Sequence, residues 1–79
     1  MLKIKAWVIM EHYGSFKKQK NRQMVFASRN FKDIVKFLED RERLFDDNNC
    51  HHKRTKCGIM AHQNDNWWTY RFYEIKIMC

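Results

Sequence analysis

A dense run of positive charge between residues 17 and 22, next to two aromatic rings, has the clearest chemical potential in this chain. Lysine and arginine attract phosphate groups, and exposed rings stack on unpaired bases. Because Gly14 and Ser15 suit a hairpin turn, the run is predicted to project as one basic and aromatic finger. The alternative is a solvated strand edge, where lysines oppose pairing between sheets. The predicted binding residues of this finger are Tyr13, Phe16, Lys17, Lys18, Lys20 and Arg22.

A cluster of cysteine and histidine offers a second kind of chemistry. Two thiolates and two imidazoles are a common ligand set for tetrahedral zinc in small domains. The spacing here lacks a pair of cysteines separated by two residues, and it lacks a matching second pair. The alternative buries Cys57 in a strand and leaves the adjacent histidines on a loop, so we predict no metal and no cofactor. The weak ligand candidates are Cys50, His52, Cys57 and His62.

Positive charge is distributed unevenly along the 79 residues. Residues 33–47 contain six acidic and three basic side chains, whereas the remainder contains 13 basic and three acidic ones, which together give the net charge of +7. This asymmetry favours a polyanionic partner or an acidic protein surface, with solubility alone as the plain alternative. The polar connection at residues 50–56 adds Lys53, Arg54 and Lys56 to the predicted binding residues.

Hydrophobic periodicity predicts the elements that must hold these residues. The expected order is strand, strand, helix, strand, strand, at residues 2–10, 23–27, 31–45, 57–62 and 67–78. In the first strand Ala6, Val8 and Met10 belong to the apolar face. A turn at Gly14 and Ser15 would set Glu11 opposite Lys18 and Trp7 opposite Arg22, but it would also put Asn21 and Gln23 on that face. A longer loop or a bulge would remove the conflict.

The helix and the last strand are the most distinct elements. Asn30 is expected to cap the helix, with Asp33 in its first turn. Its buried stripe is predicted to contain Phe31, Ile34, Val35, Leu38 and Phe45. The run 67–78 is apolar or aromatic on both faces, which predicts a strand in the middle of the sheet. Thr69, Tyr73, Ile75 and Ile77 are placed among the buried residues, and the row Trp68, Tyr70 and Phe72 is either core or an exposed stacking platform.

These elements predict an α+β fold in one domain, residues 1–79, with a four-stranded, mainly antiparallel sheet and one helix packed on one face. An uncovered sheet face with several aromatics would be either a binding surface or a dimer interface. No signal peptide or membrane span is recognised, and the odd count of three cysteines favours reduced thiols. We therefore expect a cytoplasmic protein, in the host cytosol if the source is viral.

The sequence contains no glycine-rich phosphate loop, nucleophile elbow or kinase signature, so we predict that the protein is not an enzyme. Its basic, aromatic-rich character is similar to that of small accessory proteins of viruses and mobile elements, which dock on a host machine and block it. The leading hypothesis is an inhibitor that docks through its basic surface on a nucleic-acid-processing enzyme, such as a defence nuclease, or on a nucleoprotein complex. One alternative is a regulator that binds DNA or RNA directly. Another is a structural homodimer.

Overall fold

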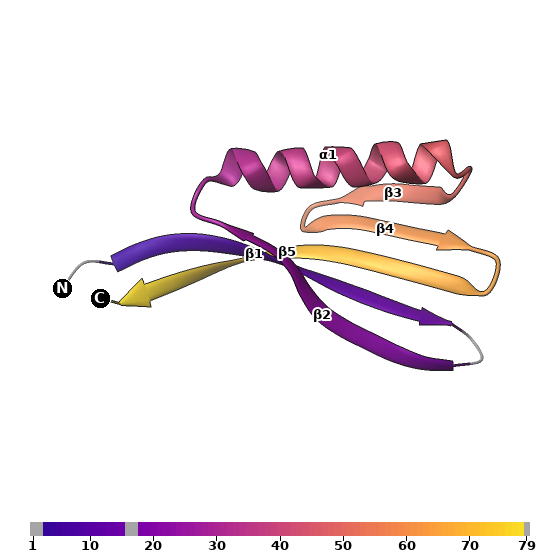
Figure 1. The fold of residues 1–79 in the computed structure, drawn as a ribbon, viewed down its shortest axis with the longest axis horizontal. Coiled ribbons are helices and arrows are strands. Elements are labelled where there is room, and N and C mark those ends of the chain that lie inside the picture. Colours follow the sequence, from indigo (N-terminus) through magenta and orange to yellow (C-terminus); the bar gives the residue numbers. More distant parts are fainter. Residues whose placement is uncertain (1–2, 16–17, 79) are drawn as a thin grey trace.

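The computed structural model describes residues 3–15 and 18–78 of the chain. Its described part has one helix and a five-stranded antiparallel sheet (Figure 1). In chain order the elements are β1 (Lys3–Ser15), β2 (Lys18–Ser28), α1 (Phe31–Asp47), β3 (His51–Thr55), β4 (Gly58–Gln63) and β5 (Asn66–Met78). The predicted α+β class is confirmed. The predicted count of four strands is wrong, because the polar connection at residues 50–56 contains the additional strand β3.

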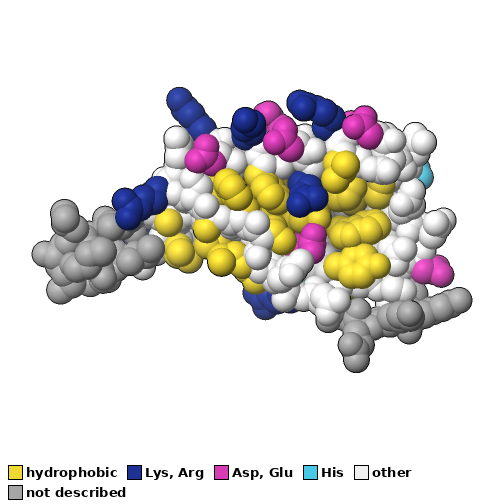
Figure 2. All heavy atoms as spheres, in the orientation of Figure 1, with side chains coloured by type: hydrophobic (Ala, Val, Ile, Leu, Met, Phe, Trp, Pro, Cys, Tyr) yellow, Lys and Arg dark blue, Asp and Glu magenta, His cyan; other side chains and the backbone are white. Residues whose placement is uncertain are grey.

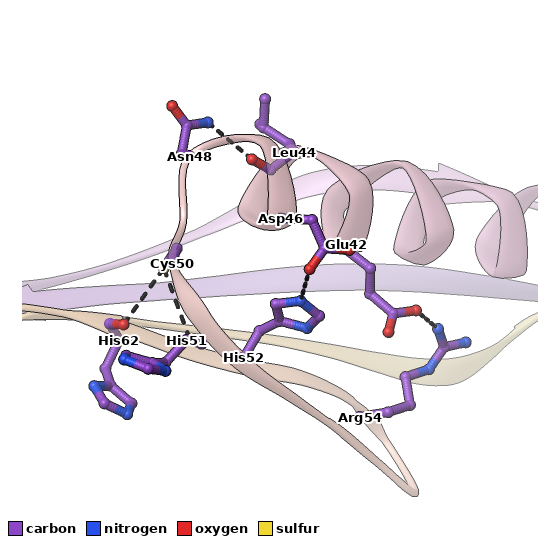
Figure 3. Close-up of polar contacts among 9 residues, drawn as sticks. All are labelled: Glu42, Leu44, Asp46, Asn48, Cys50, His51, His52, Arg54 and His62. Carbon is purple, nitrogen blue, oxygen red and sulfur yellow. Dashed lines mark hydrogen bonds and ion pairs between the residues drawn. The ribbon is translucent and has the colours of Figure 1, made fainter.

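β3 could not be predicted from hydrophobic periodicity because it has no apolar alternation. His51–Thr55 contains only polar and charged residues, and it occupies one edge of the sheet, where it pairs with β4 along its whole length. Its alternate side chains still have different surroundings. His52 and Arg54 contact acidic residues of α1 (Figure 3). Polar contacts with the helix, and not apolar burial, therefore hold this face of the strand against α1.

The strand order is β2-β1-β5-β4-β3, so β5 lies at the centre of the sheet as predicted. β5 pairs with β1 from Asn66 to Met78 and with β4 from Asn66 to Arg71. The predicted register between β1 and β2 is wrong. Glu11 pairs with Gln23 and Trp7 with Ser28. Two register shifts interrupt this ladder, so the bulge that we considered as an alternative is present.

α1 packs on one face of the sheet, and its N-terminus is capped as predicted. The Asn30 side chain accepts a hydrogen bond from the Lys32 backbone N–H at 3.0 Å. Ile34, Leu38 and Phe45 are buried, whereas Phe31 is 40 % exposed. The described residues include no helix with the length and apolar character that crossing a membrane requires.

The buried core shows which face of each strand the helix covers. Ile34 and Leu38 of α1 join a buried cluster with Ile9 of β1, Ile59 of β4 and Tyr70 of β5. The covered face of β5 is therefore the row of Trp68, Tyr70 and Phe72. Our placement of Tyr73 and Ile75 among the buried residues is wrong, since both are exposed, and Thr69 is half-buried. The predicted burial of Ile77 concerns a side chain outside the described ones. Figure 2 shows hydrophobic side chains gathered below the helix, with charged side chains along the helix itself.

Candidate functional site

The sheet surface opposite α1 is here called the open face. Successive side chains of a strand point to opposite faces, and cross-strand partners share a face. Because Ile9, Ile59 and Tyr70 face the helix, the residues next to them in sequence belong to the open face. Among the side chains that the structure describes, its cationic, imidazole and aromatic members are those of Arg22, Lys53, Arg71, His12, His51, His62, Trp67 and Tyr73.

The open face carries no acidic side chain, although the chain has nine, all of them within the described residues. Six belong to α1, which lies on the other side of the sheet. Glu11 and Glu74 lie on the covered side, since they pair with Tyr70 and Trp7. Asp65 lies in the turn between β4 and β5. A surface with cations and no anions has a one-sided positive potential, which attracts anionic ligands and speeds their association.

A hollow of ≈ 360 Å³ lies on β3, β4 and β5 toward one end of this face. The rings of His51 and His62, which face each other across the β3–β4 ladder, stack with centroids 5.3 Å apart. Trp67 and Lys53 also line the hollow, together with His52, Met60, Ala61, Trp68 and Thr69. The hollow therefore combines flat rings with a nearby cation, in a volume within the range of small-molecule sites.

Gly14 positions the tryptophan of this hollow. Gly14 is the cross-strand partner of Trp67, and a Cβ atom at Gly14 would lie 2.5 Å from Cζ2 of the indole. That distance is far below van der Waals contact, so a larger residue at position 14 would displace the ring. Gly14 had been predicted to form a hairpin turn. Instead it lies inside β1 and leaves room for the indole.

The structure divides the predicted finger between two faces. Tyr13 lies on the covered face, where its ring is 5.4 Å from that of Trp68 and its hydroxyl donates to Asn66 Oδ1 at 3.3 Å. Arg22 lies on the open face opposite His12. The prediction that Tyr13 and Arg22 project together is therefore wrong, because neighbours in this ladder alternate between faces. Phe16 and Lys17 lie outside the described residues, and of Lys18 and Lys20 only the position in β2 is described.

The second predicted set is divided in the same way. Lys53 lies on the open face and lines the hollow. Arg54 instead forms an ion pair with Glu42 of α1 (Figure 3), which places its side chain on the helix side of the sheet and away from the open face. Lys56 is exposed in the turn between β3 and β4. Of these three residues, Lys53 is the one that lies on the same face as the cations Arg22 and Arg71.

The cysteine and histidine candidates are not brought together as a metal site. No group of three or more potential ligands gathers within residues 3–15 and 18–78. Cys50 is buried, with its Sγ 3.4 Å from the carbonyl oxygen of His62, and burial raises the pKa of its thiol. His52 Nε2 lies 2.7 Å from Asp46 Oδ1, and Cys57 is exposed. Figure 3 shows His52 directed to the helix and the rings of His51 and His62 directed away from it.

The sequence pattern did not predict that one surface contains His12, His51, Trp67, Arg71 and Tyr73. The available signal was the period of two, which groups Trp67 with Arg71 and Tyr73 along the last strand. It could not connect them with His51, because β3 was not recognised as a strand. Comparisons with protein-family models, with characterised proteins and with solved structures gave no match. The function must therefore be argued from the chemistry of the open face.

Proposed function

We propose that the protein is a non-enzymatic binding protein whose open face binds single-stranded nucleic acid. One observation carries the proposal: the open face combines the cations Arg22, Lys53 and Arg71 with the rings of Trp67 and Tyr73, and has no acidic side chain. Proteins that bind single strands use positive surfaces to attract the backbone and aromatic rings to stack on the bases. A sheet face with aromatic side chains is one established way to present both.

The hollow is the proposed site for a base. The indole of Trp67 and the stacked rings of His51 and His62 offer flat surfaces, and Lys53 is placed for the adjoining phosphate. Stacking of one base on an aromatic ring contributes about 1–3 kcal/mol, and it tolerates any base because every base has a π-face. Strong sequence preference is therefore not expected. The phosphate contacts instead predict an affinity that falls steeply with salt.

A second candidate function is the docking of an accessory or inhibitor protein on a host enzyme or nucleoprotein complex that handles nucleic acid. Met24 and Met60 favour it, since both lie on the open face and are 60 % and 50 % exposed. Flexible methionine side chains are common on surfaces that adapt to protein partners. In either case we expect the protein in the cytosol, where thiols stay reduced. Both described cysteines, Cys50 and Cys57, are free.

Fluorescence anisotropy with labelled 20-nucleotide RNA and DNA, single- and double-stranded, across ~50–300 mM salt tests the proposal. We expect single strands to bind at micromolar concentration or tighter. The double variant Lys53→Glu and Arg71→Glu should lose at least about tenfold in affinity, because it reverses two phosphate contacts. Arg29→Glu with Lys32→Glu is the matched control, since it changes the net charge equally at exposed positions off the open face.

Equal losses in the two double variants would contradict a specific role of the open face, because net charge alone would then explain binding. Absence of binding at ~150 mM salt would overturn the proposal and leave docking on a protein as the remaining candidate. Capture of partners with the wild-type protein, using the Lys53→Glu and Arg71→Glu variant as the reference, would then test that candidate.

A further inference from the structure

The second half of β5 has a free edge. β4 accompanies β5 only as far as Arg71, whereas β1 accompanies it to Met78. Within the described residues no strand pairs with residues 73–78 on the side opposite β1. Figure 1 shows the start of β1 and the end of β5 projecting together beyond the helix. A two-stranded ribbon is marginally stable by itself, and a free edge is a template for pairing with another strand.

The backbone of this edge is oriented for such pairing. The Phe72 N–H donates to the Cys57 carbonyl at 2.8 Å, which places the polar groups of Phe72 on the side of β4. Along an antiparallel strand, alternate residues direct their N–H and C=O groups to the same side. Glu74 and Lys76 therefore present their backbone donors and acceptors to the free edge.

The side chains of the same edge are complementary to themselves. If two copies of β5 pair antiparallel about a two-fold axis at Ile75, Glu74 of each copy lies opposite Lys76 of the other. A centre at Glu74 or at Lys76 would instead oppose like charges, which destabilises a cross-strand pair. Ile75 is 38 % exposed and would meet its equivalent at the axis. Among centres at Glu74, Ile75 and Lys76, charge thus selects Ile75, and that register also covers an exposed apolar side chain.

We propose that two copies of this chain associate through the free edge of β5, centred on Ile75, to form one continuous antiparallel sheet. Such an interface is isologous, so each copy contributes the same segment and the assembly closes as a dimer. Because the two-fold axis is perpendicular to the sheet, both helices lie on one side and both open faces on the other. This arrangement differs from the face-to-face homodimer considered above, and it does not depend on the proposed nucleic-acid binding.

Sedimentation velocity between ~1 and 200 μM protein tests the pairing, because the dissociation constants of weak dimers fall in this range. A reducing buffer excludes dimers that a disulfide through Cys79 would form. We expect the wild type to dimerise within this range. Lys76→Glu should weaken the dimer by about tenfold or more, because it sets a second carboxylate opposite Glu74 of the other copy. Within one chain the same change is favourable, since position 76 lies opposite Lys5. A weaker dimer with an undiminished thermal midpoint would therefore support the interface.

A charge reversal gives the sharpest test. The double variant Glu74→Lys with Lys76→Glu restores opposite charges at both symmetric positions, so it should recover the dimer that Lys76→Glu loses. Lys53→Glu, with an equal change of net charge on a different strand, is the control and should dimerise like the wild type. A wild type that remains monomeric at ~200 μM would overturn the proposal, and so would a dimer that Lys76→Glu leaves unchanged.

Discussion

At the scale of single residues, two polar side chains in the core depend on their surroundings for their protonation state. Cys50 is 6 % exposed beneath the end of α1, and Tyr70 is 3 % exposed at the centre of the sheet. Burial is the main reason why the pKa of each group is raised. For Tyr70 a hydrogen bond from its hydroxyl to the Glu11 carboxylate raises the pKa further. Both groups are therefore neutral in the folded protein at physiological pH.

The first residue-scale prediction concerns thiol reactivity. The thiolate is the reactive form, and burial both limits access to Cys50 and disfavours its thiolate. In a variant with Cys57→Ser and Cys79→Ser, reaction with an aromatic disulfide reagent at pH 8 should be on the order of 100-fold slower in the folded protein than in guanidinium. A variant that retains only Cys57, which is exposed, is the matched control and should react rapidly when folded. Similar rates for the two folded variants would contradict the burial of Cys50.

The second prediction concerns alkaline stability. Because the pKa of Tyr70 is higher in the folded than in the unfolded state, unfolding releases a proton once the pH passes the ordinary tyrosine pKa of about 10. The contribution of Tyr70 is complete below that pH and is lost as the pH rises toward its folded-state pKa. Tyr70→Phe should cost about 1 kcal/mol at pH 8, and the difference from wild type should shrink by pH 11.

Urea unfolding at a series of pH values measures this difference. Tyr73→Phe is the control, because Tyr73 is 40 % exposed and lies on the open face. A difference between wild type and Tyr70→Phe that stays constant from pH 8 to pH 11 would contradict the proposed protonation linkage.

At the scale of elements, α1 is held by its apolar stripe in the middle and by polar contacts with β3 near its C-terminus. Ile34 and Leu38 are almost completely buried against the sheet. Glu42 contacts Arg54, and Asp46 contacts His52. Aspartate is unfavourable at a helix C-terminus, and on this ground we expected the helix to end by residue 45. It continues to Asp47, and the contact with His52 offsets part of that cost.

Two leucines of the same helix provide a matched prediction. Leu38 is 1 % exposed and Leu44 is 46 % exposed. Leu38→Ala should lower the free energy of unfolding by about 2–5 kcal/mol, because it removes buried contacts and leaves a cavity. Leu44→Ala should change it by less than about 1 kcal/mol. Chemical denaturation measures both variants, and equal losses would contradict the orientation of the helix.

At the scale of the whole molecule, the acidic side chains are confined to one side of the sheet, where they are mixed with cations such as Arg41 and Arg54. Helix α1 and the covered side hold all the acidic side chains except Asp65, and the open face holds cations with rings. The proposed anionic ligand would therefore meet no acidic side chain on the open face. Pairing through β5 would extend this side without covering it, because the proposed interface uses a sheet edge. A dimer could then present two equivalent binding faces to one strand, which raises the effective affinity for long ligands.

The sequence by itself determined the elements whose signals are local. The Asn30 cap, the apolar stripe with Ile34 and Leu38, and the central position of the last strand could all be predicted. Only the tertiary structure decided which face of each strand is buried. β5 is apolar or aromatic on both faces, so a period of two cannot choose between them, and the choice depends on which set meets the helix. In β1 the period of two favoured the face of Ala6, Val8 and Met10, whereas Ile9 of the other face joins the core under the helix.

The composition of the candidate site was decided almost entirely by the tertiary structure. Lys53 and Arg22 were predicted from local charge. Arg54 and Tyr13 were predicted with them but lie on the covered side, because successive side chains of a strand point to opposite faces. Trp67 joins His51 only because β3, β4 and β5 lie side by side in one sheet. Such a surface is built from residues far apart in the chain. Its composition depends on strand order and register, which long-range packing determines and local sequence does not.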